Sequence, residues 1–376
     1  MITLKIWHGP MRTELTLPLP DGKLETELVN AFHATPPRFV ADEVTPQALS
    51  VLNGKEIDLD ELNFLAKRME AFIPYEAEQF LAAVQVESPS NVKDFINLSF
   101  NMERYALVQN ADGLAAVGRN HLLDKLGGIP ASEIDKTYFE QAGRNLLATG
   151  EGIPTSYGLL FQNADVPYRE VYDGTTFPYY EHRGGVIAVA QLEYGAKKEY
   201  LYLPEDRFAV TKAARRLKAP SSSMCKAAFI GFTLDNPMWV QHLENVLRDE
   251  GISEANEFAI AFPKSDEGME KLAAVAAYAD VSDSKEIMRL AMHMDDFVFI
   301  RDAETDEDVG RYFVDFDSEY RASPELEDYI DFDALGNQIS EDREGQFVEG
   351  GFVCMDSGCS LELILEDEEN LMMRGM

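Results

Sequence analysis

The chain has 376 residues, of which 67 are Asp or Glu and 33 are Lys or Arg, so its formal net charge is −34. Hydrophobic residues make up 45% of the sequence, which is enough to build folded cores and excludes an acidic disordered tail. The negative charge excludes a conventional nucleic-acid binder and a polybasic membrane contact, because phosphate groups would be repelled.

The cysteines and the N-terminus indicate a reducing compartment. Cys225, Cys354 and Cys359 are a sparse and odd-numbered set, so we expect neither a disulfide framework nor a zinc site. The first residues lack the basic flank and apolar core of a signal peptide, and no run approaches the ~18 apolar residues of a membrane span. We therefore expect a cytoplasmic protein without a membrane contact.

The first predicted elements are a hairpin and a helix. Residues 2–7 and 13–17 alternate apolar and polar side chains around a glycine–proline pair, as two paired strands would. Residues 58–72 place their apolar side chains on one helical face. Asp58 precedes this helix and is predicted to cap it.

The elements that follow are two further helices and a short strand. Residues 75–85 predict the second helix, and Ser90 is the predicted cap of the third. Residues 105–108 predict the strand. This pattern of local hairpins and short helices favours the α+β class, because nothing in it suggests an alternating parallel sheet.

The second half of the chain repeats this order. Residues 184–203 predict a hairpin, Ser282 the cap of a helix, and residues 297–300 a strand. The segment 15–32 resembles 199–217, with Pro20 opposite Pro204.

An internal repeat supports the same division. Residues 76–120 align with 268–312 without a gap at an offset of 192, with ten identical residues among the 45 pairs. One residue of drift then aligns Phe139 with Phe332 and Gly143 with Gly336. The sequence therefore predicts an internally duplicated chain whose two α+β units are residues 1–181 and 182–376.

The acidic residues are concentrated near the C-terminus. Residues 266–376 carry a net charge of −23, whereas residues 165–220 carry +1. A chain made acidic for solubility would be acidic over its whole surface, so the uneven distribution favours a surface that binds a partner. The alternative is a solvated acidic face without a partner.

The sequence carries no positive signal for catalysis or for a cofactor. It has no phosphate-binding loop, no dinucleotide fingerprint and no zinc-protease motif. Residues 302–308 have the opening rhythm of a calcium loop, but Glu307 stands where the loop needs Gly and Phe313 where it needs Glu. We therefore expect no metal, no cofactor and no catalytic residues. An enzyme with an unrecognised carboxylate site, for example at Asp295-Asp296, is the least favoured alternative.

The densest acidic stretch is the candidate partner-binding surface. Duplex DNA presents one negative charge per ~1.7 Å of its axis, and carboxylates on a rigid body can approach that density. Interleaved apolar residues, among them Val309, Phe313, Phe316 and Tyr329, are expected to anchor the stretch to a core. The candidate residues are Asp302, Glu304, Asp306, Glu307, Asp308, Asp315, Asp317, Glu325, Glu327, Asp328, Asp331 and Asp333.

Several short motifs resemble the ArdA-type antirestriction proteins of plasmids and conjugative elements. The matching segments are 62–66 (LNFLA), 93–98 (KDFINL) with Asn101, Tyr105, Val117-Gly118, 329–336 (YIDFDALG) and 347–352 (FVEGGF). The resemblance implies an elongated multi-domain chain of small α+β units that often dimerises. It also implies mimicry of duplex DNA and inhibition of type I restriction–modification enzymes. Familiar members are about half as long as this chain.

The expected function is therefore a DNA mimic that binds the basic DNA cleft of a type I restriction–modification enzyme. Its partner would be a DNA-binding protein, and direct nucleic-acid binding is not expected. The alternative is an acidic interaction module of a mobile element that binds another basic protein.

Overall fold

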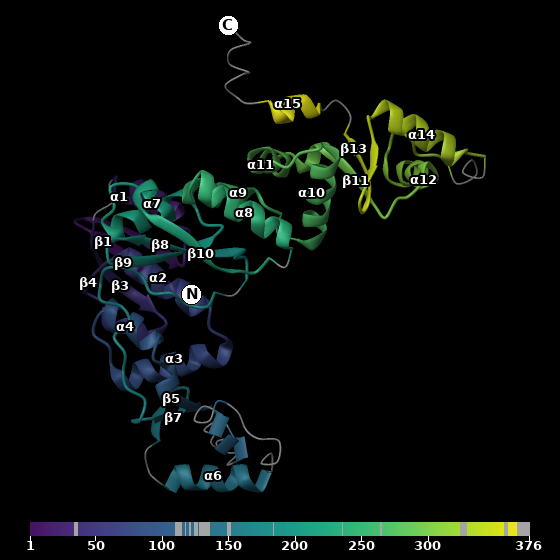
Figure 1. The fold of residues 1–376 in the computed structure, drawn as a ribbon. Coiled ribbons are helices and arrows are strands. Elements are labelled where there is room, and N and C mark those ends of the chain that lie inside the picture. The colour runs from purple at the N-terminus through teal and green to yellow at the C-terminus, as the bar shows by residue number, and fades with distance from the viewer. Residues whose placement is uncertain are drawn as a thin grey trace. The chain divides into compact units, whose positions relative to one another are not determined.

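The computed structural model of the chain describes two compact units, Met1–Gly231 (unit 1) and Phe232–Met376 (unit 2) (Figure 1). Unit 1 has a net charge of −7 and unit 2 a net charge of −27 over the full sequence. The described residues are all except 34–36, 110–114, 117, 120–121, 124–126, 128–135, 149–151, 183, 235, 264, 324–328, 357–359 and 367–376.

Unit 1 begins with a four-stranded antiparallel sheet of order β2-β1-β3-β4. The predicted hairpin is confirmed, because β1 pairs with β2 across Gly9, whose φ of 59° suits a tight turn. The helix α1 (Asp21–Phe32) packs on β2 and buries Leu24 and Leu28. The strands are β1 (Ile2–His8), β2 (Met11–Leu17), β3 (Phe39–Thr45) and β4 (Glu56–Ile57).

A helical segment follows the sheet. Asp58 caps α2 as predicted, since its carboxylate accepts hydrogen bonds from the N–H groups of Asp60 (2.8 Å) and Glu61 (3.3 Å). The predicted cap of α4 was wrong by one residue: Asn91 accepts from the N–H of Asp94 (2.9 Å), while the Ser90 hydroxyl donates to the carboxylate of Asp94. The elements are η1 (Gln47–Leu52), α2 (Leu59–Glu70), α3 (Pro74–Glu87) and α4 (Val92–Ser99).

A second sheet of unit 1 has the order β5-β7-β6. Its strand β5 confirms the strand predicted at 105–108. Gly158 is required where β7 meets β5, because its φ is +134° and a Cβ there would lie 2.2 Å from the carbonyl oxygen of Val108. The elements are η2 (Met102–Arg104), β5 (Tyr105–Val108), α6 (Lys136–Ala148), β6 (Ile153–Thr155) and β7 (Gly158–Gln162).

The last part of unit 1 is a third antiparallel hairpin with a helix. The hairpin of β8 and β9 confirms the one predicted at 184–203, and α7 packs against α1. The sheet order is β10-β8-β9. The elements are β8 (Ala188–Tyr194), β9 (Lys197–Leu203), α7 (Arg207–Leu217), η4 (Ser222–Met224) and β10 (Lys226–Phe232).

Unit 2 combines helices with one three-stranded antiparallel sheet of order β11-β13-β12. Asp283, one residue after the predicted Ser282, caps α11 by accepting from the N–H of Lys285 (2.9 Å). The helices are α8 (Pro237–Asp249), α9 (Ile252–Ala261), α10 (Asp266–Tyr278), α11 (Ser284–Met292), η5 (Met294–Asp296), α12 (Asp306–Phe316), α14 (Phe332–Asp342) and α15 (Leu361–Leu365). The strands are β11 (Phe297–Arg301), β12 (Gln346–Val348) and β13 (Gly351–Met355).

The order of elements recurs along the chain. The helices α3 and α4, then η2 and β5, correspond to α10, α11, η5 and β11 at the offset of 192 residues seen in the sequence. The hairpins β1–β2 and β8–β9 begin 186 residues apart. The alignment of Pro20 with Pro204 was therefore wrong by two residues: Pro18 is the counterpart, since each proline directly follows the second hairpin strand.

These elements confirm the α+β class as a chain of small units. None of the helices in the described ranges combines the length and apolar character that crossing a membrane requires. The compact units divide after Gly231, whereas the sequence repeat was divided at 181/182. The hairpin β8–β9 and α7, which the repeat assigns to the second copy, thus belong to the compact body of the first.

Candidate functional site

The acidic stretch of unit 2 is built on two helices that touch through glycine. A Cβ on Gly310 of α12 would lie 2.1 Å from the carbonyl oxygen of Phe332, and one on Gly336 of α14 would lie 1.8 Å from that of Asp306. The first residue of each helix therefore lies at the fifth residue of the other. This arrangement brings the acidic first turns of α12 and α14 side by side.

The first turn of α12 is closed by a capping box. The Asp308 carboxylate accepts hydrogen bonds from the Thr305 hydroxyl (2.8 Å) and from the N–H groups of Thr305 (3.0 Å) and Glu304 (3.1 Å). The Thr305 hydroxyl in turn accepts from the N–H of Asp308 (3.3 Å). These hydrogen bonds lower the pKa of Asp308, and the bond from the Thr305 hydroxyl contributes most. Asp308 is thus engaged in holding the helix end.

Three more candidate carboxylates have local partners. Glu307 forms an ion pair with Arg311 one turn later (2.7 Å). Asp306 is half-buried and accepts a long hydrogen bond from Ser340 (3.4 Å). Asp331 caps α14 by accepting from the N–H of Ala334 (3.1 Å).

Asp317 belongs to an ion cluster around Arg343, whose side chain is only 9% exposed. The Arg343 guanidinium lies 3.0 Å from Asp317 and 3.8 Å from Glu319, and it stacks over the ring of Phe313 at 4.7 Å. This arginine joins the end of α14 to the end of α12. The carboxylate of Asp317 is therefore structural at least in part.

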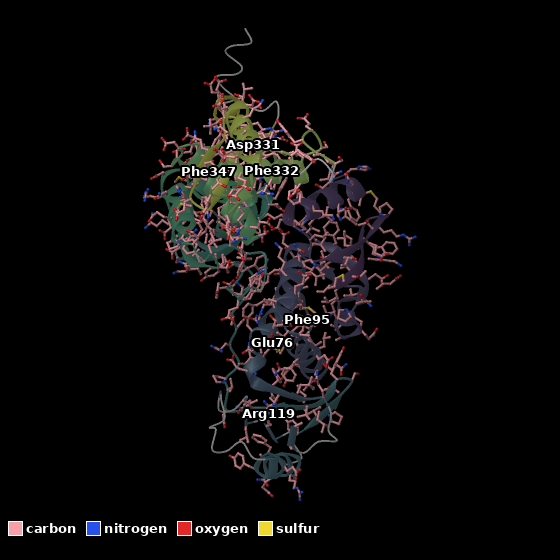
Figure 2. All side chains as sticks on the ribbon, turned by 90° about the vertical axis from the view of Figure 1, so that its right-hand side faces the viewer. Glu76, Phe95, Arg119, Asp331, Phe332 and Phe347 are labelled. Atoms are coloured by element: carbon pink, nitrogen blue, oxygen red, sulfur yellow. The ribbon has the colours of Figure 1, made fainter. Side chains whose placement is uncertain are left out.

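Four candidate carboxylates remain exposed and available. Glu304, Asp315 and Asp333 have no side-chain hydrogen bond or ion pair within the described ranges of the chain. Asp302 is 88% exposed, and Arg301, at 3.8 Å, is its one ion-pair partner among the residues that the structure describes. Figure 2 shows many side-chain oxygen atoms around the labelled Asp331 and Phe332. Glu325, Glu327 and Asp328 lie outside the described residues.

Two of the predicted apolar anchors are not anchors. Val309 and Phe313 are buried, as expected, and pack with Ile339 of α14. Phe316 and Tyr329 are instead 75% and 85% exposed. Phe316 is the last residue of α12, and its ring lies 5.0 Å from that of Tyr312 one turn earlier.

The corresponding region of unit 1 has the same close contact at glycine, but it lacks the acidic residues that begin α12. A Cβ on Gly118 would lie 1.9 Å from the carbonyl oxygen of Phe139 and 2.6 Å from the nitrogen of Gly143. These are the residues that the repeat aligned with Gly310, Phe332 and Gly336. Ala115 and Ala116 stand where Glu307 and Asp308 stand in unit 2.

The basic stretch 212–218 is largely committed to internal ion pairs. Lys212 is buried, and its Nζ lies 2.6 Å from the carboxylate of Asp60 and 3.8 Å from that of Asp21. Arg216 donates through Nε to Glu199. Of the four basic residues in this stretch, only Arg215 and Lys218 are exposed.

The asparagine side chains of the ArdA-like motifs form hydrogen bonds with backbone groups and do not face solvent. Asn63 exchanges two hydrogen bonds with Leu19, at 2.9 and 2.8 Å. Asn97 does the same with Tyr172, at 2.8 and 2.9 Å. Asn101 bonds the N–H and the carbonyl of Arg169, both at 2.8 Å. Figure 2 shows Phe95 of the same motif inside unit 1, where it is fully buried.

The structure offers no arrangement for a metal within the described residues, where no group of three or more His, Cys, Asp or Glu side chains could hold an ion. Residues 306–308, part of the calcium-like rhythm, lie in the first turn of α12. A scan against models of protein families found no match to the chain, and a search of curated proteins found no similar sequence.

Proposed function

We propose that the chain is a DNA mimic that inhibits type I restriction–modification enzymes by occupying their basic DNA cleft, in the cytoplasm. The observation that carries the proposal is the set of exposed carboxylates on the paired helices α12 and α14, in a unit with a net charge of −27. Each carboxylate would replace a DNA phosphate in contact with Lys or Arg of the target.

The helices α12 and α14 suit this role because the backbone that carries the carboxylates is held in place. The glycine crossing fixes the two helices at backbone contact, and Arg343 joins their ends through Asp317. Because these helix backbones are already held together, only the exposed carboxylate side chains lose freedom on binding, so less of the electrostatic attraction is offset by lost entropy. The carboxylates are therefore expected to bind from a preformed backbone.

The two crossings differ in charge, and this difference supports unit 2 as the target-facing part. The crossing of unit 2 begins with Asp306-Glu307-Asp308, whereas its counterpart in unit 1 begins with Leu114-Ala115-Ala116. We therefore place the target contact in unit 2. The resemblance to ArdA-type proteins also implies a homodimer, which analytical ultracentrifugation tests.

A competition experiment tests the proposed function. A type I restriction–modification enzyme is bound to a fluorescent DNA duplex, and the chain is added at 50 mM and at 300 mM salt. The chain should displace the duplex, more effectively at low salt, because exposed charges are screened within ~10 Å at 0.1 M. It should not bind the duplex itself, since both are strongly negative.

The outcome separates the proposed function from its alternative. If the chain leaves the enzyme–DNA complex intact but is retained by another basic protein from cells with a mobile element, it is an acidic interaction module instead. Direct binding of the chain to the duplex would contradict both ideas.

A further inference from the structure

Unit 1 contains a buried cluster of charges where elements from both copies of the repeat meet. Lys67 of α2 lies 3.2 Å from Glu205 and 3.5 Å from Asp21 of α1. Lys212 of α7 lies 2.6 Å from Asp60. The cluster therefore ties α1 and α2 of the first copy to β9 and α7 of the second, along what we term the α1–α7 seam.

Glu199 of β9 is the most deeply buried member of this cluster, with a side chain 1% exposed. Its Oε1 accepts a hydrogen bond from Arg216, but its Oε2 is buried and has no hydrogen-bond partner among the described residues. Glu199 lines a cavity of about 40 Å³, which is room for about one water molecule.

The charges around this cavity do not balance. The acidic groups are Asp21, Glu25, Asp60, Glu199 and Glu205, and the basic groups are Lys67, Arg216 and the adjacent Lys212. The carboxylates therefore outnumber the cations. A buried carboxylate with an oxygen that accepts no hydrogen bond costs folding free energy. Proteins usually avoid that cost by protonating the carboxylate.

We propose that Glu199 binds a proton at neutral pH and that this proton makes the stability of the α1–α7 seam depend on pH. The protonated carboxyl keeps Oε1 for Arg216 and offers an O–H to the cavity. Glu205 is less suited to hold the proton, because it already pairs with Lys67. A metal ion is disfavoured by the small cavity and by the charges of Lys67 and Arg216 beside it.

The electrostatics agree with this geometry. Burial is the main cause that raises the pKa of Glu199 to about 7, and the charge of Asp21 adds to it. The charge and hydrogen bond of Arg216 oppose the rise, and so does the backbone N–H of Phe177. The nearby Tyr180 and Tyr202 contribute no charge, because burial raises the pKa of both phenols. For Lys67, burial lowers the pKa, but Asp21 and Glu205 outweigh it and the net pKa is raised, so the lysine stays charged.

The direction of the pH dependence follows from linkage. Because the pKa is higher in the folded chain than the usual 4.5, folding favours the protonated form. The stability due to this group is fully present below pH 4.5, decreases as the pH rises towards 7, and changes little above 7.

A thermal unfolding series at pH 5.5, 7.0 and 8.5 tests the proposal with Glu199→Gln, since the amide imitates the protonated carboxyl. The advantage of E199Q over the natural chain should grow by roughly 5 °C between pH 5.5 and 8.5. The matched control is Glu193→Gln on the preceding strand. Glu193 pairs with Lys198 at the surface, and that hydrogen bond lowers the pKa of Glu193. The effect of Glu193→Gln on the melting temperature should therefore not change between pH 5.5 and 8.5.

Two further measurements keep the proposal refutable if E199Q folds poorly. In ¹³C-carboxyl-labelled chain, one glutamate signal should titrate near pH 7. The proposal is overturned if all glutamates titrate below pH 6, or if the E199Q advantage is the same at every pH. It is also overturned if potassium chloride, but not tetramethylammonium chloride at equal ionic strength, stabilises the natural chain, since an ion would then fill the cavity.

Discussion

The four available carboxylates of unit 2 give the sharpest test of the DNA-mimic proposal. The variant Asp302→Asn, Glu304→Gln, Asp315→Asn and Asp333→Asn removes four charges and keeps shape and hydrogen bonding within α12 and α14. An exposed ion pair changes affinity by about threefold, so four lost contacts should weaken competition with DNA by roughly 80-fold at low salt. The loss should shrink at 300 mM salt because of screening.

The assay is displacement of a fluorescent duplex from the restriction–modification enzyme, with calorimetric unfolding of each chain alongside it. The matched control removes the same number of exposed charges from unit 1, through Glu14→Gln, Glu27→Gln, Glu56→Gln and Glu181→Gln. The control should compete almost as well as the natural chain. Equal weakening by both variants would show that only net charge matters, and no weakening by either would refute the assignment of this surface.

Three other substitutions test the structural assignments. Asp308→Ala should lower the melting temperature of unit 2 by a few degrees, because the capping box is lost, and the loss should disappear as the pH falls through the lowered pKa of Asp308. Gly336→Ala should destabilise unit 2 by roughly 3 kcal/mol in denaturant titration, since its Cβ would overlap the carbonyl of Asp306, whereas Gly231→Ala, with open space around it, should be neutral. Asn97→Ala should cost roughly 2–4 kcal/mol and speed proteolysis near Tyr172, because two buried backbone groups lose their partners; unchanged proteolysis would contradict that role.

Local elements were predictable from the sequence because their signals are local. Alternation of side chains identified the β1–β2 hairpin, and the position of Asp58 identified the start of α2. The repeat also aligned Gly118 with Gly310 and Gly143 with Gly336 before any geometry was known. At Gly118, Gly310 and Gly336 the crossings leave no room for a Cβ, which explains why glycine recurs there.

The sequence could not predict which charges are free, because pairing depends on residues far apart in the chain. Lys212 pairs with Asp60, which is 152 positions away in the sequence, so this lysine of the basic stretch is buried in an internal ion pair. In the acidic stretch, Asp308 and Asp331 serve as caps, and removing all the carboxylates of 302–308 together would therefore also weaken the helix end. The exposure of Phe316 was likewise missed, because the spacing of apolar residues along a helix does not by itself show which of them reach the core.

The boundary after Gly231 determines where a deletion can remove part of the chain without breaking ion pairs in the part that remains. A deletion that removed the second copy at 182 would take away α7, and Lys212 and Arg216 with it, so that Asp60 would lose its ion-pair partner and Asp21 would keep only Lys67. A deletion at 232 would leave the α1–α7 seam whole. A deletion that restored a single copy at 182 in one step would therefore break the α1–α7 seam, whereas changes within unit 2 leave the residues of the seam untouched.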